Sequence, residues 1–149
     1  VTTAGVTSAA DTLAAACREA GGESKMIFLK SGHPNCSWCR AFDRYHELPE
    51  VRAIIGKYFV VANIDTVNMS DGSEIFGKYA KPGAPSWVII SPEKEVVIDS
   101  YGETGNVGYP LAPHETAHYI GAIRKAAPGI SEDELADLSE QIQIAAGEK

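Results

Sequence analysis

Two cysteines separated by two residues carry the clearest chemistry in this sequence: Cys36 and Cys39 frame the tetrapeptide Cys-Ser-Trp-Cys. Asn35, directly before them, is a residue type favoured at the N-cap of a helix, so we place Cys36 in the first turn of that helix. A helix N-terminus stabilises negative charge and so favours the thiolate that attacks disulfides. Cys39 is expected one turn later, mostly behind Cys36, where it can resolve a mixed disulfide. The pattern predicts thiol–disulfide exchange with Cys36 as nucleophile and Cys39 as resolving thiol.

Hydrophobic periodicity predicts the elements that must position this pair. Buried strands are expected at residues 26–29, 58–64 and 87–90, with residues 96–101 as the hairpin partner of the third. Helices are expected at residues 8–20, from Cys36 to the break at Pro49, and at 51–56, 74–79, 114–127 and 131–146. Gly21 and Gly22 should stop the first helix. Because strands and helices alternate, we expect an α/β fold: a mixed central sheet of about four strands with helices on both faces.

Length and composition limit the classes of protein that fit. The chain has 149 residues, 44% of them apolar, and a net charge of -7. We expect one domain over residues 1–149, with a core at about 8–127 and a helical extension at about 131–146. Without a basic stripe or an apolar run of roughly 20 residues, neither a nucleic-acid partner nor a membrane span is expected. Residues 102–113 should form an irregular loop, and Cys17 should be a buried, unreactive thiol.

A second pattern suggests different chemistry. His114, Glu115 and His118 match H-E-x-x-H, in which two histidines bind zinc and the glutamate activates water. The longer form of this motif needs a third ligand where the sequence has Arg124, and a cation does not bind zinc. We therefore expect no metal and keep a zinc hydrolase as an alternative. The competing interpretation is an amphipathic helix whose histidines face solvent and whose packed side chains are Ala117, Ile120 and Ile123.

Motifs after the cysteine pair resemble those of the thioredoxin superfamily. They are NID at residues 63–65, YAKPGAP at 79–85, SWVII at 86–90 and the glycine at 102, in the family's order and spacing. Together with VRAIIGKYFVVANID at residues 51–65, they are similar to single-domain thioredoxin-like proteins, many of them exported in bacteria. The resemblance covers about residues 8–127. It implies a cis bond between Ala84 and Pro85, beside the cysteines, that presents a backbone edge to an extended substrate. Trp38 would either pack beneath the site or contact that substrate.

Two positions depart from the family pattern. The family's buried acid in the first strand and its lysine partner correspond here to Lys30 and Val61, so the proton relay for the second cysteine is missing or rebuilt. Lys30 either lies buried near Cys39, where a neutral amine can accept that cysteine's proton, or extends to solvent. The family's tryptophan before the first cysteine is Asn35, which makes the rim more polar. His33 lies in the same loop and is expected either in solvent or beside Cys36, favouring its thiolate.

We therefore expect a thiol–disulfide oxidoreductase that reduces, forms or isomerises disulfides in cysteine-containing proteins. It would work with a thiol redox partner and without a cofactor. The alternatives are a non-catalytic thioredoxin-fold binding module and the zinc hydrolase. The chain begins at Val1 rather than Met, which is consistent with a removed export signal. On that ground we expect an extracytoplasmic protein, periplasmic or secreted, with the cytoplasm as the alternative.

Overall fold

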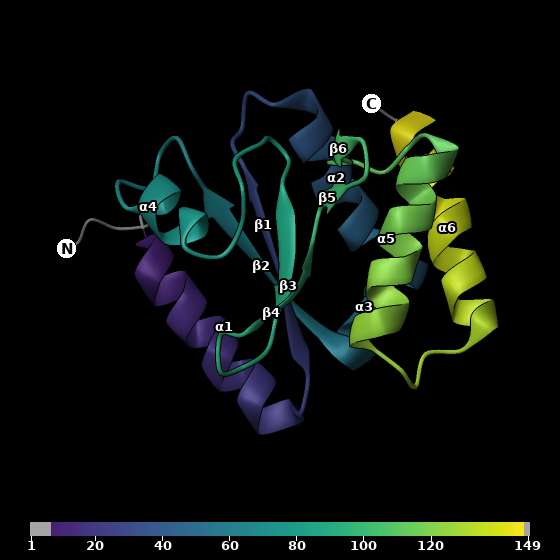
Figure 1. Ribbon diagram of the computed structural model, residues 1–149, viewed down its shortest axis with the longest axis horizontal. Coiled ribbons are helices and arrows are strands. Elements are labelled where there is room, and N and C mark those ends of the chain that lie inside the picture. Colours follow the sequence, from purple (N-terminus) through teal and green to yellow (C-terminus); the bar gives the residue numbers. More distant parts are fainter. Residues whose placement is uncertain (1–6, 148–149) are drawn as a thin grey trace.

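A mixed sheet of four strands separates two groups of helices in the computed structural model, which describes residues 7–147 (Figure 1). The strand order is β2-β1-β3-β4; β1 and β2 are parallel, and β3 is antiparallel to both β1 and β4. In chain order the elements are α1 (Ala9–Glu23), β1 (Met26–Gly32), α2 (Ser37–Glu47), α3 (Pro49–Tyr58), β2 (Phe59–Asp65), α4 (Gly72–Gly77), β3 (Trp87–Ile90), β4 (Val96–Asp99), β5 (Tyr101–Gly102), β6 (Gly105–Asn106), α5 (Pro113–Ala126) and α6 (Glu132–Gly147). The expected α/β architecture is confirmed.

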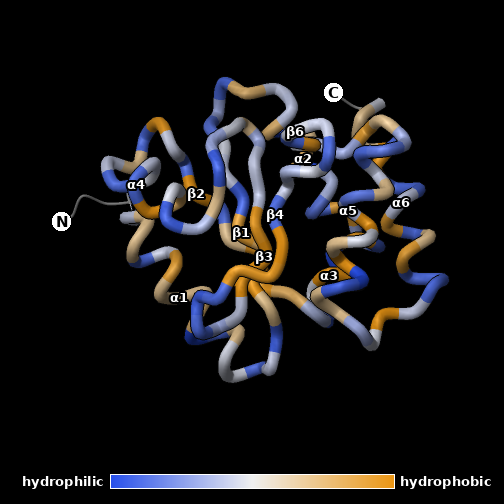
Figure 2. Tube along the Cα trace, in the orientation of Figure 1, coloured by the Kyte–Doolittle hydropathy of each residue, from blue (hydrophilic) through white to orange (hydrophobic). Residues whose placement is uncertain are grey.

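Each face of the sheet has its own apolar core, because successive side chains of a strand point to opposite faces. Ile27 and Leu29 of β1 pack against α1 and α4, whereas Phe28 packs against α2, α3, α5 and α6. Figure 2 shows the hydrophobic colour concentrated along β1 and β3, between the two helical layers. The two central strands are thus buried on both faces, which explains why they appear in the sequence as continuous apolar runs.

Several element ends differ from the expected ones. α1 continues through Gly21 and Gly22 to Glu23, and its C-cap is Ser24, which takes the left-handed conformation with φ 57°, so the expected glycine stop is wrong. Glycine permits a helix exit but does not force one, and the next strand begins only at Met26. β1 extends beyond its apolar run to Gly32, because its backbone remains paired with β2 as far as Asp65.

The segment after residue 100 is more ordered than expected. The hairpin strand β4 ends at Asp99, and Tyr101 belongs instead to a short ladder in which β5 pairs with β6. Residues 102–113 therefore contain part of a small hairpin as well as irregular chain. In Figure 1 this hairpin lies near the N-terminal end of α2.

The last helix belongs to the larger core. The expected capping box opens α6: Ser131 N–H donates to Glu134 Oε1 at 3.0 Å and Glu134 N–H donates to Ser131 Oγ at 3.1 Å. Leu138 is fully buried, and its carbonyl oxygen accepts a hydrogen bond from the Tyr45 hydroxyl at 2.9 Å. The Tyr109 hydroxyl donates to the Ile142 carbonyl at 2.7 Å. α6 is therefore fastened to α2 and to the segment after β6.

No helix within residues 7–147 has the length and apolarity needed to cross a membrane. Val1, on which the expectation of export rests, lies outside the described residues.

We predict that Leu138→Ala lowers the free energy of unfolding by about 2–5 kcal/mol, since it leaves a cavity in the core against α2 and α3. Urea denaturation followed by circular dichroism measures the effect. Asp137→Ala changes the exposed neighbouring residue on the same helix and should shift stability by no more than about 0.5 kcal/mol. Equal midpoints for the two variants would show that α6 contributes little to the core.

Candidate active site

Cys36 and Cys39 are joined by a disulfide at the start of α2, with their Cα atoms 5.2 Å apart. The N-cap of this helix is Cys36 itself, not Asn35 as expected. The backbone of Cys36 is extended, with φ -96° and ψ 112°, so helical conformation begins only at Ser37. In the cap position the Cys36 sulfur accepts a hydrogen bond from Cys39 N–H at 3.1 Å. The sulfur thus occupies the place of the side-chain oxygen that usually caps a helix.

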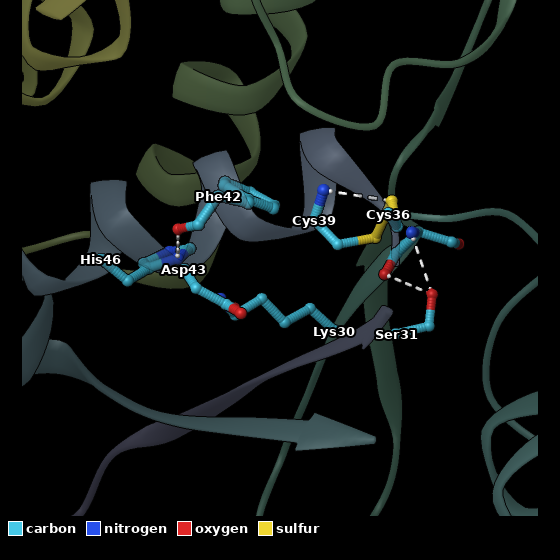
Figure 3. Close-up of polar contacts among 8 residues, drawn as sticks. Lys30, Ser31, Cys36, Cys39, Phe42, Asp43 and His46 are labelled. Atoms are coloured by element: carbon cyan, nitrogen blue, oxygen red, sulfur yellow. Dashed lines mark hydrogen bonds and ion pairs between the residues drawn. A yellow bond between two sulfur atoms is a disulfide. The ribbon is translucent and has the colours of Figure 1, made fainter. Parts of the chain in front are cut away.

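The two sulfurs have different surroundings. Cys36 is half-buried, whereas Cys39 is only 5% exposed and rests on the end of β1. A Cβ atom added to Gly32 would lie 3.0 Å from both Cβ and Sγ of Cys39, closer than such atoms normally approach. The absence of a side chain at Gly32 therefore lets Cys39 settle against the strand. Figure 3 shows the two cysteines joined through their sulfur atoms, with the hydrogen bond from Cys39 N–H to Cys36 Sγ as a dashed line.

The peptide bond between Ala84 and Pro85 is cis, as the resemblance implied. Cys36 Sγ lies 3.4 Å from the carbonyl oxygen of Ala84, so the loop that contains the cis bond faces the outer cysteine directly. Ala84 is exposed and Pro85 is buried. The backbone edge of Ala84 is consequently accessible beside the disulfide.

Ser31, which the sequence analysis did not single out, fastens this loop to β1. Its hydroxyl donates to the Gly83 carbonyl at 2.8 Å and accepts from Ser86 N–H at 3.0 Å. Its backbone N–H donates to the Ser86 carbonyl at 2.8 Å. The cis loop is therefore held by the residue next to Gly32, the glycine that receives Cys39.

Asn106, also missed, holds the loop from the other side. Its Nδ2 donates to the Pro85 carbonyl at 3.1 Å, while its Oδ1 accepts from the Ser100 hydroxyl at 2.7 Å and from Gly108 N–H at 3.1 Å. Gly108 has φ 49°, and a Cβ there would lie 3.1 Å from the Pro85 carbonyl oxygen. The segment that was expected to be an irregular insertion is therefore a support for the cis loop.

Lys30 is buried beneath α2 and forms an ion pair. Only 3% of its side chain is exposed, and its Nζ lies 2.6 Å from Oδ1 of Asp43, which is about half exposed (52%). Figure 3 shows the Lys30 side chain running from the strand toward Asp43 on α2. Burial lowers the pKa of Lys30, and the neighbouring carboxylate of Asp43 opposes that shift. The expectation that Lys30 extends freely into solvent is therefore wrong.

This ion pair occupies the position next to Cys39. Lys30 and Gly32 lie two residues apart on the same face of β1, about 7 Å along the strand. Asp43 follows Cys39 by four residues, so both lie on the same face of α2. Gly32 contacts Cys39, and Lys30 contacts Asp43. These two contacts are therefore neighbours along the line where α2 packs on β1.

The remaining rim residues are partly buried. His33 is half-buried near Asp65. Burial acts to raise the pKa of Asp65, but hydrogen bonds from Asn68 and Val67 hold that pKa below its usual value. The ring of Trp38 lies 5.2 Å from that of Tyr109 and also lines a surface hollow beside Pro85. Trp38 therefore both packs against the segment after β6 and faces the space beside the cis loop.

Two of the three H-E-x-x-H residues make other contacts, and the third, His114, is exposed. His118 Nε2 lies 2.8 Å from the Asp99 carbonyl oxygen, and Glu115 Oε1 accepts from Ala112 N–H at 3.0 Å at the start of α5. No group of three potential metal-binding side chains is present within residues 7–147. The expected packing face was also wrong in part, because α5 buries Tyr119, Ala122, Ile123 and Ala126, while Ala117 is exposed. Cys17 packs against the smaller core from α1, but it is half-buried rather than buried as expected.

Known structures share this arrangement of elements. No protein-family model matches the chain, and no curated protein matches it. A disulphide isomerase from Xylella fastidiosa Temecula1 superposes with a TM-score of 0.59 at 21% identity, covering 92% of this chain and 92% of that chain. A thioredoxin from Thermus thermophilus superposes with a TM-score of 0.53 at 21% identity, covering 78% of this chain and 88% of that chain. The chain has the thioredoxin fold, with its Cys36–Cys39 pair at the start of α2.

Proposed function

We propose that this protein is a thiol–disulfide oxidoreductase acting on disulfides of protein substrates. The observation that carries the proposal is the asymmetry of the pair. Cys36 caps a helix at the rim, 3.4 Å from the Ala84 carbonyl, and the Cys39 bonded to it is buried. A helix N-terminus favours a thiolate, and the backbone edge at Ala84 offers an extended chain a place to pair. An outer nucleophile and an inner resolving thiol are what disulfide exchange requires.

The steps follow from these positions. In the reduced protein the Cys36 thiolate attacks one sulfur of a substrate disulfide, forms a mixed disulfide and displaces the other substrate sulfur as a thiolate. Cys39 then loses its proton and attacks Cys36 Sγ, which restores the Cys36–Cys39 bond and releases the second substrate thiol. Two electrons pass from the protein to the substrate. A thiol redox partner then reduces the Cys36–Cys39 disulfide and so regenerates the reduced protein. Run in the opposite direction, the disulfide form oxidises a substrate dithiol.

We further propose that Lys30 acts on Cys39 as a fixed positive charge. The ion pair with Asp43 at 2.6 Å favours the protonated lysine in spite of its burial. A protonated amine cannot accept a proton, but its positive charge beneath α2 stabilises a thiolate at Cys39, whose contact with Gly32 lies two residues further along β1. The charge of Lys30 is thus opposite in sign to that of the buried acid that the thioredoxin superfamily has at this position.

We propose an extracytoplasmic location, because protein disulfides persist mainly in oxidising compartments, where a protein that forms or isomerises them has its substrates. The second candidate, a binding module without catalysis, would use the same Ala84 edge and the hollow beside Pro85. The two candidates differ only in whether Cys36 reacts.

Substitution of each cysteine tests the reaction. In a Cys17→Ser background, Cys39→Ser should accumulate a covalent complex with disulfide-bearing proteins, because attack still occurs and internal release does not. Cys36→Ser should trap little. The complexes are seen by non-reducing electrophoresis after incubation with an oxidised extract, and dithiothreitol should dissolve them. Equal trapping by both variants, or none by either together with no reduction of insulin, would favour the binding module.

The acidity of Cys36 provides a second test. With its sulfur at a helix N-cap, reduced Cys36 should have a pKa below the value of about 8.5 for a free thiol. Alkylation by iodoacetamide across a range of pH, with each site assigned by mass spectrometry, gives the value. Cys39, which is buried, should be alkylated far more slowly. A Cys36 that titrates at or above the free-thiol value would argue against its role as nucleophile.

The ion pair makes two opposite predictions for stability. Lys30→Met removes a buried charge, so the free energy of unfolding should stay equal or rise. Asp43→Asn leaves the buried lysine without its counter-charge and should lower the free energy of unfolding by about 1–3 kcal/mol.

Because the pKa of Lys30 is lowered in the folded state, that state binds the proton less tightly than the unfolded chain. Wild-type stability should therefore rise relative to that of Lys30→Met as pH increases toward 10.5.

The same variant tests the electrostatic role. Lys30→Met should slow the release of a mixed disulfide about tenfold while leaving the attack by Cys36 almost unchanged. Quenched-flow separation of the two steps measures this split. Lys25→Met is the matched control, since it also removes a lysine that is paired with an acid, Glu23. Lys25 directly precedes the first residue of β1. Unchanged release in Lys30→Met, or slowing of both steps alike, would remove Lys30 from the mechanism.

A further inference from the structure

A surface hollow of about 440 Å³ lies beside the cis loop. It is built from three parts of the chain: the second residue of α2, the cis loop, and the stretch from the end of β6 to the first turn of α5. Its lining residues are Trp38, Ala84, Pro85, Asn106, Val107, Gly108, Tyr109, Leu111, Ala112 and Glu115. One wall thus belongs to residues 102–113, which the sequence analysis expected to be an irregular loop.

The hollow and the reactive sulfur share a neighbour, Ala84. Ala84 lines the hollow, and the carbonyl oxygen of Ala84 lies 3.4 Å from Cys36 Sγ. A substrate bonded to Cys36 is therefore tethered next to the hollow. Since an extended chain advances about 3.3 Å per residue, side chains one or two residues from the substrate cysteine can reach it.

Most of the side chains that line the hollow are apolar or aromatic, and polar atoms of the chain are exposed between them. The rings of Trp38 and Tyr109, which lie 5.2 Å apart, form one side together with Leu111, which is half-buried. Among the lining residues that the structure describes, Glu115 is the one that carries a charge. Its Oε1 accepts a hydrogen bond from Ala112 N–H. Such a surface favours a bulky apolar side chain and disfavours a carboxylate.

The walls are also fixed before a substrate arrives. The Tyr109 hydroxyl is anchored to the Ile142 carbonyl at 2.7 Å, and Asn106 fastens the Pro85 carbonyl at 3.1 Å. The Trp87 indole N–H donates to the Gly108 carbonyl at 3.0 Å. A surface held in this way loses little conformational freedom on binding, so its shape can select among substrates.

From these observations we propose that the hollow is a specificity subsite, which takes an aromatic or branched aliphatic side chain within two residues of the substrate cysteine. The inference rests on the proposed oxidoreductase function. It assigns to Trp38, Tyr109 and Leu111 the recognition of that side chain, and to Glu115 the rejection of acidic ones.

Symmetric disulfide dimers of short peptides test the subsite. Each peptide carries one cysteine flanked on one side by Phe, Leu, Ser or Asp, so attack on either sulfur tethers the same sequence. The fully reduced protein is mixed with each dimer and a single turnover is followed, which yields two peptide thiols and the Cys36–Cys39 disulfide. Each rate is divided by the rate with dithiothreitol, which removes the intrinsic reactivity of the peptide. On at least one flank, Phe and Leu dimers should react about tenfold faster than Ser dimers, and Asp dimers slowest.

Two variants assign the preference to the hollow. Leu111→Ser should bring the ratio of Phe to Ser rates close to one, and Glu115→Gln should raise the relative rate of the Asp dimer while its side-chain oxygen still accepts from Ala112. Ile144→Ser, which changes an exposed isoleucine on α6 away from the hollow, should keep the wild-type ratios. The ratios of the wild-type protein stand as a test even if Leu111→Ser fails to fold.

The outcomes separate the two levels of the proposal. Equal normalised rates for all dimers, or a preference that Leu111→Ser leaves intact, would overturn the subsite and leave the oxidoreductase function standing. No reaction with any dimer, under conditions in which dithiothreitol reduces them all, would overturn both.

Discussion

The contact between Cys39 and Gly32 is the constraint on which the site depends. The first turn of α2 rests closely on the end of β1 because Gly32 has no side chain; an added Cβ would lie 3.0 Å from Cβ and Sγ of Cys39 and would push the cysteine outward. That contact buries Cys39 and leaves Cys36 at the rim, where it caps the helix. The next residue toward the N-terminus, Ser31, fastens the cis loop opposite Cys36. Helix, strand and loop therefore meet at two adjacent residues of β1.

Patterns that depend on neighbouring residues in the sequence were predicted well. The apolar run Trp87–Ile90 has the bounds of β3, and the Ser131–Glu134 capping box opens α6 as expected. Strand and helix alternation was enough to give the mixed sheet with helices on both faces. Element ends were less predictable, since Gly21 and Gly22 stay helical and β1 continues past its apolar residues. Those ends are set by pairing and packing partners elsewhere in the chain.

The site shows the same division between local and long-range information. The cysteine spacing indicated the reactive pair, and the family resemblance implied the cis bond at Pro85, which the structure contains. Ser31 and Asn106 were missed because serine and asparagine are common in loops, and their partners lie 52 and 21 residues away. The pairing of Lys30 with Asp43 across 13 residues was hidden for the same reason. An asparagine in a short hairpin gives no sequence signal that it will reach a cis proline.

The central claim is that Cys36 and Cys39 form a working redox pair rather than a permanent crosslink. The most direct measurement is the reduction potential of the pair, obtained by equilibrating the protein in thiol–disulfide buffers and counting labelled thiols by mass spectrometry, with Cys17 as an internal reference. The account predicts one two-electron transition between about -270 and -120 mV, the range of thiol–disulfide exchange proteins. A potential below about -300 mV, typical of structural disulfides, would contradict it.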